Sequence, residues 1–125
     1  MEYRIEVEEY ATQKLIHTTI TGTMSEKERN RIGVETVRKM RDNKLSKVIW
    51  DIRKAELDYS LIHSHLVVLN LAALGVKNED YVAVIYFHNK EQHEHAKTVA
   101  HNRSIFNLDY FQNLEEGIDW LTGKG

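Results

Sequence analysis

Residues 81–87 read Tyr-Val-Ala-Val-Ile-Tyr-Phe, a nearly continuous apolar run. A strand that is apolar at almost every position is buried on both faces, as strands are in the middle of a parallel sheet. Residues 48–52, Val-Ile-Trp-Asp-Ile, repeat this pattern. The sequence therefore predicts an α/β fold built around central parallel strands.

The N-terminal part predicts two antiparallel strands at the edge of that sheet. Apolar and charged residues alternate over 3–7, which indicates a half-buried strand. Residues 15–21 are rich in β-branched residues, which favour strands. The connection through residues 11–13 is short enough to join the two strands as a hairpin. We expect Gly22 to end the second strand.

Two helices are predicted before the central apolar run. The first covers 25–43, where Ser25 and Glu28 have the spacing of a capping box. A loop at 53–58 is expected to lead to the second helix, at roughly residues 59–74.

Two more helices are predicted after the central run. One covers about residues 91–103 and is followed by a short strand at 108–111. The other begins after Asn113, a residue type suited to capping. Strands that alternate with helices require crossover connections and a mainly parallel sheet. We therefore expect one domain spanning residues 1–125, with a mostly parallel β-sheet, an antiparallel N-terminal edge hairpin and about four helices.

The composition excludes several classes of protein. The chain of 125 residues has a formal net charge of -2 and no cysteine, which excludes disulfide frameworks and thiolate metal sites. The N-terminus lacks the pattern of a secretory leader, and no apolar run is long enough for an integral membrane segment. We therefore expect a cytoplasmic protein. Basic residues on the first helix alternate with acids and read as a solvated face, so no nucleic-acid partner is expected; they are Arg29, Arg31, Arg38, Arg41 and Lys44.

Two stretches carry a resemblance to a known family. One is residues 48–51 followed by Asp58-Tyr59-Ser60 at the mouth of the second predicted helix. The other is 100–103 together with 111–121, where a short strand closing on Phe leads to a helix with two acids and a final Trp-Leu. With the order of elements, these stretches resemble the STAS domain, specifically its SpoIIAA-like branch.

The resemblance implies a protein that is not an enzyme. STAS domains act as anti-sigma-factor antagonists, as cytoplasmic parts of anion transporters and as sensory modules. The SpoIIAA-like branch also resembles the CRAL-TRIO lipid-transfer fold, which implies carriage of an apolar ligand.

In the antagonists of this family, a serine at the start of the second helix accepts phosphate. The resemblance places Ser60 at that position, with Asp58 before it, although Tyr59 and Leu61 depart from the family's pattern. A phosphate on Ser60 would lie at the positive end of the helix dipole. The simpler interpretation is that Asp58 or Ser60 only caps the helix.

The second predicted helix carries a broader apolar arc than one ordinary buried face needs. The additional apolar surface would line a ligand cavity, cover a homodimer interface or meet the third helix. The simpler interpretation is that this is a fully buried crossover helix. Ligand pockets are mostly apolar with a few polar groups. The predicted ligand-binding residues are Trp50, Tyr59, Ile62, His63 and Leu66, with His65 as a further polar candidate and His88 beyond the carboxyl end of a central strand.

The seven histidines do not predict a metal site. His93 and His95 stand two residues apart, so on a helix they point in different directions, and His63 and His65 share this spacing. These side chains are expected to be solvated polar groups. The sequence also lacks the nucleophile elbow of esterases and a glycine-rich phosphate loop.

We therefore expect a non-catalytic STAS-like module, without cofactor or metal, that binds a small apolar, lipid-like ligand or a regulatory protein around the second helix. The first alternative is a phospho-regulated antagonist switch at Ser60. A small hydrolase or metal site is the second alternative.

Overall fold

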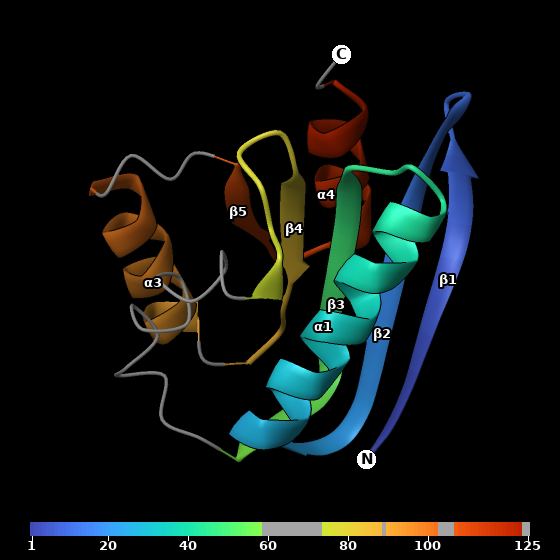
Figure 1. Ribbon diagram of the computed structural model, residues 1–125. Coiled ribbons are helices and arrows are strands. Elements are labelled where there is room, and N and C mark those ends of the chain that lie inside the picture. The colour runs from blue at the N-terminus through green and yellow to red at the C-terminus, as the bar shows by residue number, and fades with distance from the viewer. Residues whose placement is uncertain (59–73, 89, 103–106, 124–125) are drawn as a thin grey trace.

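The computed structural model describes residues 1–58, 74–88, 90–102 and 107–123 (Figure 1). Within these ranges lie five strands and three helices. The strands are β1 (Glu2–Tyr10), β2 (Gln13–Ser25), β3 (Lys47–Asp58), β4 (Tyr81–Ile85) and β5 (Leu108–Phe111). The helices are α1 (Glu26–Asp42), α3 (Lys90–Asn102) and α4 (Leu114–Thr122). About four helices were expected; the one at 59–74 falls almost entirely outside the described residues.

The strands form one mixed sheet in the order β1-β2-β3-β4-β5. β1 pairs antiparallel with β2, and each later neighbour pairs parallel. This confirms the mostly parallel sheet with an antiparallel N-terminal hairpin. Figure 1 shows α1 across the front of the sheet and α4 behind it, so the two helices cover opposite faces.

The hairpin turns at Ala11 and Thr12, which have φ values of 50° and 66°. Two positive values at the centre of a two-residue loop are typical of a type I′ turn, whose twist matches that of the flanking strands. The register runs from Tyr10 opposite Gln13 to Glu2 opposite Thr21. The predicted connection is thus confirmed, and β1 is paired along its full length.

The predicted loop at 53–58 and the predicted end of β2 at Gly22 are both wrong. Gly22 keeps a positive φ of 89° and pairs with Ala55, and the parallel ladder continues to Ser25 opposite Asp58. β3 carries one additional residue after Asp51, where the register shifts, and it continues beyond this bulge. The bulge lets both Ile52 and Ala55 face the same core although they are three residues apart.

The helix caps predicted at Ser25 and Asn113 are confirmed. The Ser25 side chain accepts a hydrogen bond from the Glu28 N–H, and the Glu28 side chain accepts one from the Ser25 N–H. Asn113 accepts the Glu116 N–H at 2.8 Å at the start of α4. Each cap satisfies a helix donor that would otherwise lack a partner.

One correction concerns the basic face of α1. Arg29 is only 6% exposed rather than solvated, and it donates to Asn30 Oδ1. Arg41 is half-buried and donates to the Asp80 carboxylate and to the Gly75 carbonyl. These two cations therefore belong to the packing of α1 rather than to a solvated surface.

Two main cores lie on opposite faces of the sheet. The core under α1 is built from apolar residues of α1 and of all strands except β1. Its buried members are Ile20, Met24, Ile32, Ile52, Ala55, Val84, Tyr86 and Leu108. Tyr3 of β1 is partly buried and packs against this core. The core under α4 is built around Leu15, Ile49, Ala83, Ile85 and Leu121. α4 comes so close to β4 that a Cβ on Gly117 would lie 2.5 Å from Ile85 Cδ1, so any larger residue here would require the Ile85 side chain to shift.

Candidate functional site

The first candidate site is on the α1 face, where β3, β5 and the residue directly after β4 carry aromatic side chains. Trp50 and Tyr110 pack against the core that includes Val84 and Tyr86. Along each strand these residues alternate with residues of the α4 face, which is why one face gathers them. We call the set formed by Tyr86, His93 and Tyr110 the aromatic cluster.

His93 brings α3 into this cluster. Its ring centroid lies 4.6 Å from that of Tyr86 and 5.6 Å from that of Tyr110. The two tyrosine rings meet edge to face at 6.4 Å. Lys97 Nζ lies 2.9 Å from Asp109 Oδ1 and links α3 to β5.

The imidazole of His93 is neutral in this environment. His93 is only 5% exposed, and burial lowers the pKa of its ring to about 4. A neutral imidazole offers one hydrogen-bond donor and one acceptor. The aromatic cluster thus combines apolar rings with one uncharged polar group, which is the usual lining of a site for a small apolar molecule.

His93 was expected to be solvated, and this expectation is wrong. His95, two residues later, is exposed, as their spacing requires. One signal was available: Ala96 and Ala100 stand three and seven residues after His93 and continue one helical stripe in the sequence. This spacing could have predicted that His93 lies on the apolar face of the helix expected at 91–103.

The other predicted site residues divide into described and undescribed ones. Trp50 is half-buried and packs against the α1-face core. Asp58 is the exposed last residue of β3, and His88 is exposed in the bend after Phe87. The predicted residues Tyr59, Ser60, Ile62, His63 and Leu66 lie outside the described part of the chain, as does His65.

The second candidate site is a polar network on the opposite face of the sheet. His17 of β2 lies between two carboxylates, with Nδ1 2.7 Å from Glu8 of β1 and Nε2 3.0 Å from Asp51 of β3. Arg53 donates to both oxygens of Asp51, at 2.9 and 2.8 Å, and Tyr10 donates to Glu8 at 2.8 Å. Three strands are joined by these bonds.

The charges of this network compensate one another. Burial lowers the pKa of His17, but the hydrogen bonds to Asp51 and Glu8 outweigh burial and raise the pKa above its ordinary value. Burial also opposes ionisation of Asp51, yet the bonds from His17 and Arg53 hold its pKa well below the ordinary range. Protonation of His17 is therefore favoured, and in the imidazolium form both N–H groups are engaged by carboxylate oxygens. A ring held in this way stabilises the sheet and has no free nitrogen for base or nucleophilic chemistry.

Neither face holds a recognisable metal centre within the described ranges. No group of three or more histidine, aspartate or glutamate side chains in residues 1–58, 74–88, 90–102 and 107–123 is placed to hold an ion. The helices of the same ranges are also too short or too polar to cross a bilayer.

Comparison with solved structures shows the fold. An uncharacterized protein of the DUF3478 family from Shewanella loihica PV-4, with a SpoIIAA-like fold, superposes with a TM-score of 0.62 at 18% identity, over 95% of this chain and 93% of that chain. The anti-sigma factor antagonist SpoIIAA in its unphosphorylated form gives 0.51 at 14% identity, over 96% and 99%. No protein-family profile and no curated protein matches the sequence. The chain therefore has the SpoIIAA-like fold, which confirms the resemblance at the level of architecture.

Proposed function

We propose that this SpoIIAA-like domain is a non-catalytic module that binds a small apolar, lipid-like molecule on the α1 face, beside Trp50 and the aromatic cluster. The observation that carries the proposal is the burial of neutral His93 between Tyr86 and Tyr110. A cationic histidine would be costly to desolvate against an apolar ligand, whereas a neutral one is compatible with it.

The position of the cluster supports this proposal. Tyr86 directly follows β4 and Tyr110 lies in β5, near the carboxyl ends of parallel strands, where open α/β sheets place their ligands. The apolar segment predicted to contribute the remaining contacts leaves β3 after Asp58. The chain returns to the described part at Leu74, whose side chain packs beside Gly33 of α1. Both ends of the segment are thus anchored on elements that border this face.

Binding would be driven by removal of apolar surface from water, worth about 25 cal/mol per Å². A regulatory protein docking on the same face is the competing partner. The phospho-regulated switch at Ser60 stays a prediction, since that residue lies outside the described part of the chain.

The two tryptophans allow a test, because they lie on opposite faces: Trp50 packs in the α1-face core and Trp120 in the α4-face core. In Trp120→Phe, the emission of Trp50 should be quenched saturably by a dibrominated stearate, which quenches on contact. In the matched variant Trp50→Phe, the same titration should leave the emission of Trp120 unchanged. Unquenched Trp50, or equal quenching of both tryptophans, would refute binding on the α1 face.

A further inference from the structure

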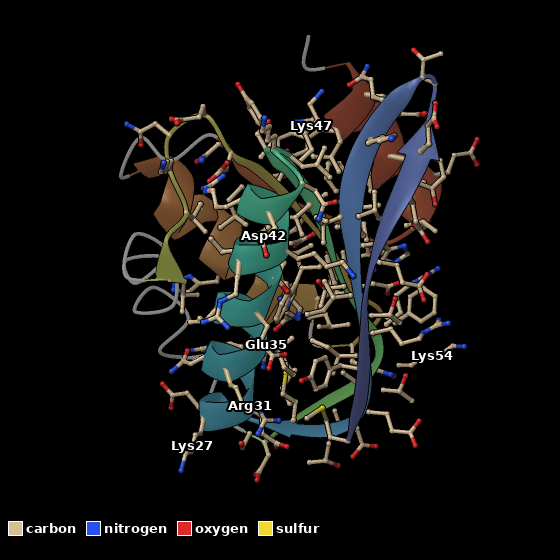
Figure 2. The ribbon with its side chains drawn as sticks, turned by 45° about the vertical axis from the view of Figure 1, so that its right-hand side comes forward. Lys27, Arg31, Glu35, Asp42, Lys47 and Lys54 are labelled. Carbon is tan, nitrogen blue, oxygen red and sulfur yellow. The ribbon has the colours of Figure 1, made fainter. Side chains whose placement is uncertain are left out.

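The outer edge of β1 is the longest open strand edge of the described sheet. β1 has nine residues and pairs with β2 alone, whereas β5 at the opposite edge has four. Figure 1 shows β1 along the rim of the molecule, and Figure 2 shows this side turned toward the viewer. The unpaired N–H and C=O groups of such an edge form a template for another strand.

The hairpin determines which residues of β1 direct their backbone groups outward. A two-residue loop closes on a hydrogen-bonded pair, here Tyr10 with Gln13, and paired residues then alternate along the ladder. Tyr3, Ile5 and Val7 therefore direct N–H and C=O to the open edge. In agreement, the Ile5 carbonyl accepts a hydrogen bond from Lys39 Nζ at 2.7 Å rather than being enclosed within the hairpin. A carbonyl oxygen has a second lone pair for another donor.

We propose that two copies of this chain associate through antiparallel β1 strands, with Ile5 opposite the partner's Ile5, so that two sheets become one. In this register the outward-directed residues of one strand face those of the other. Tyr3 then lies opposite the partner's Val7, and the reverse pair follows from the two-fold symmetry.

Charge complementarity supports this register. Arg4 lies opposite the partner's Glu6, and Glu6 opposite the partner's Arg4. Both side chains are accessible, at 72% and 48% exposure, and they already lie 3.4 Å apart within one strand. Opposite charges directly across two strands are stabilising. Farther out, Glu2 lies opposite the partner's Glu8, which is a pair of like charges. The charge of Glu8 is compensated within its own chain, since His17 Nδ1 lies 2.7 Å from Glu8 Oε1.

The other face of β1 supplies apolar contacts in the same register. Val7 is 39% exposed and offers apolar surface to a second strand. The Tyr3 O–H donates to Glu35 Oε2 at 2.6 Å and holds the ring on this face, and Figure 2 shows Glu35 on α1. Pairs of an aromatic with a β-branched residue are favourable across strands.

Other symmetric registers are less favourable. Pairing centred on Glu6 places two glutamates face to face, and pairing centred on Arg4 places two arginines face to face. Pairing centred on Val7 brings Glu6 opposite the partner's Glu8. Like charges directly opposite each other destabilise a strand pair, so we favour the register centred on Ile5, in which the pairs that flank the two-fold axis are Arg4 with Glu6.

Charge exchange tests the proposal with sedimentation equilibrium across a concentration series. The wild-type mass should rise from 14.7 kDa toward twice that value. Arg4→Glu and Glu6→Arg should each weaken self-association by about tenfold or more, because each creates two like-charge pairs. An equimolar mixture of the two variants, and the double variant Arg4→Glu/Glu6→Arg, should restore association. Both side chains are exposed, so unchanged circular dichroism and melting serve as the folding control.

Cysteine substitution tests the register directly, since the natural chain contains no cysteine. Ile5→Cys should form a disulfide-linked dimer under mild oxidation, because Cα atoms of a hydrogen-bonded antiparallel pair lie about 5.5 Å apart, within disulfide range. Glu6→Cys is the matched control and should cross-link poorly. A wild-type protein that stays at 14.7 kDa at all concentrations would overturn the proposal, as would association insensitive to the charge variants or efficient cross-linking through position 6 alone.

Discussion

Asp51→Ala is expected to lower the free energy of unfolding by about 3–5 kcal/mol, the usual cost of removing one partner from a buried ion pair. The side chain of Asp51 is 4% exposed, and it bonds to His17 and Arg53. Its removal leaves the imidazolium of His17, itself 10% exposed, with Glu8 as its sole carboxylate partner in the network. Urea denaturation followed by circular dichroism at pH 6 measures the difference from wild type.

The pH dependence provides the control for this interpretation. The pKa of His17 is raised in the folded state. Its contribution to the free energy of unfolding is therefore fully present below about pH 6.5 and is lost as the pH rises through the folded pKa. The pKa of Asp51 is lowered in the folded state. Its contribution to the free energy of unfolding is therefore present above about pH 4 and is lost as the pH falls through the folded pKa. His17→Gln should therefore cost more stability at pH 5.5 than at pH 9. An equal cost at both pH values would contradict a charged His17.

Asp80→Ala is expected to lower the free energy of unfolding by about 3 kcal/mol. Asp80 is fully buried, and its carboxylate accepts hydrogen bonds from both terminal nitrogens of Arg41 and from the Lys77 N–H at 2.7 Å. These bonds join the last turn of α1 to the segment that enters β4. We expect a smaller loss of stability than for Asp51→Ala because the Arg41 side chain is 32% exposed, so water compensates part of its charge.

Asp42→Ala is the matched control for Asp80→Ala. Asp42 is an exposed carboxylate at the end of α1, next to Arg41 in sequence and labelled in Figure 2. Its removal should change stability by less than about 0.5 kcal/mol, as for most surface substitutions. A loss in Asp80→Ala as small as that expected for Asp42→Ala would show that the Asp80 contacts contribute little to stability.

Much of the fold follows from local patterns in the sequence. The apolar runs around Val84 and Ile49 predicted buried parallel strands, and the capping residues Ser25 and Asn113 marked helix starts correctly. The extension of β3 was missed because charged residues suggested a loop. However, Ala55 and Leu57 alternate with those charges, and this alternation is the pattern of a strand buried on one face.

The polar network and the aromatic cluster were harder to predict, because both depend on contacts between residues distant in sequence. His17 is nine residues from Glu8 and 34 from Asp51. Only the pairing of β1, β2 and β3 brings these groups to one face. His93 likewise meets Tyr110 through the packing of α3 on β5. Residue spacing along one element does not contain this information.

The most direct test of the central claim is native mass spectrometry of the purified domain, combined with denaturing extraction of any bound molecule. The account predicts a species heavier than the 14.7 kDa chain by one lipid-sized mass, released on denaturation and restored when the empty protein is incubated with a fatty acid. Protein that stays at the mass of the bare chain, both as purified and after incubation, would contradict it.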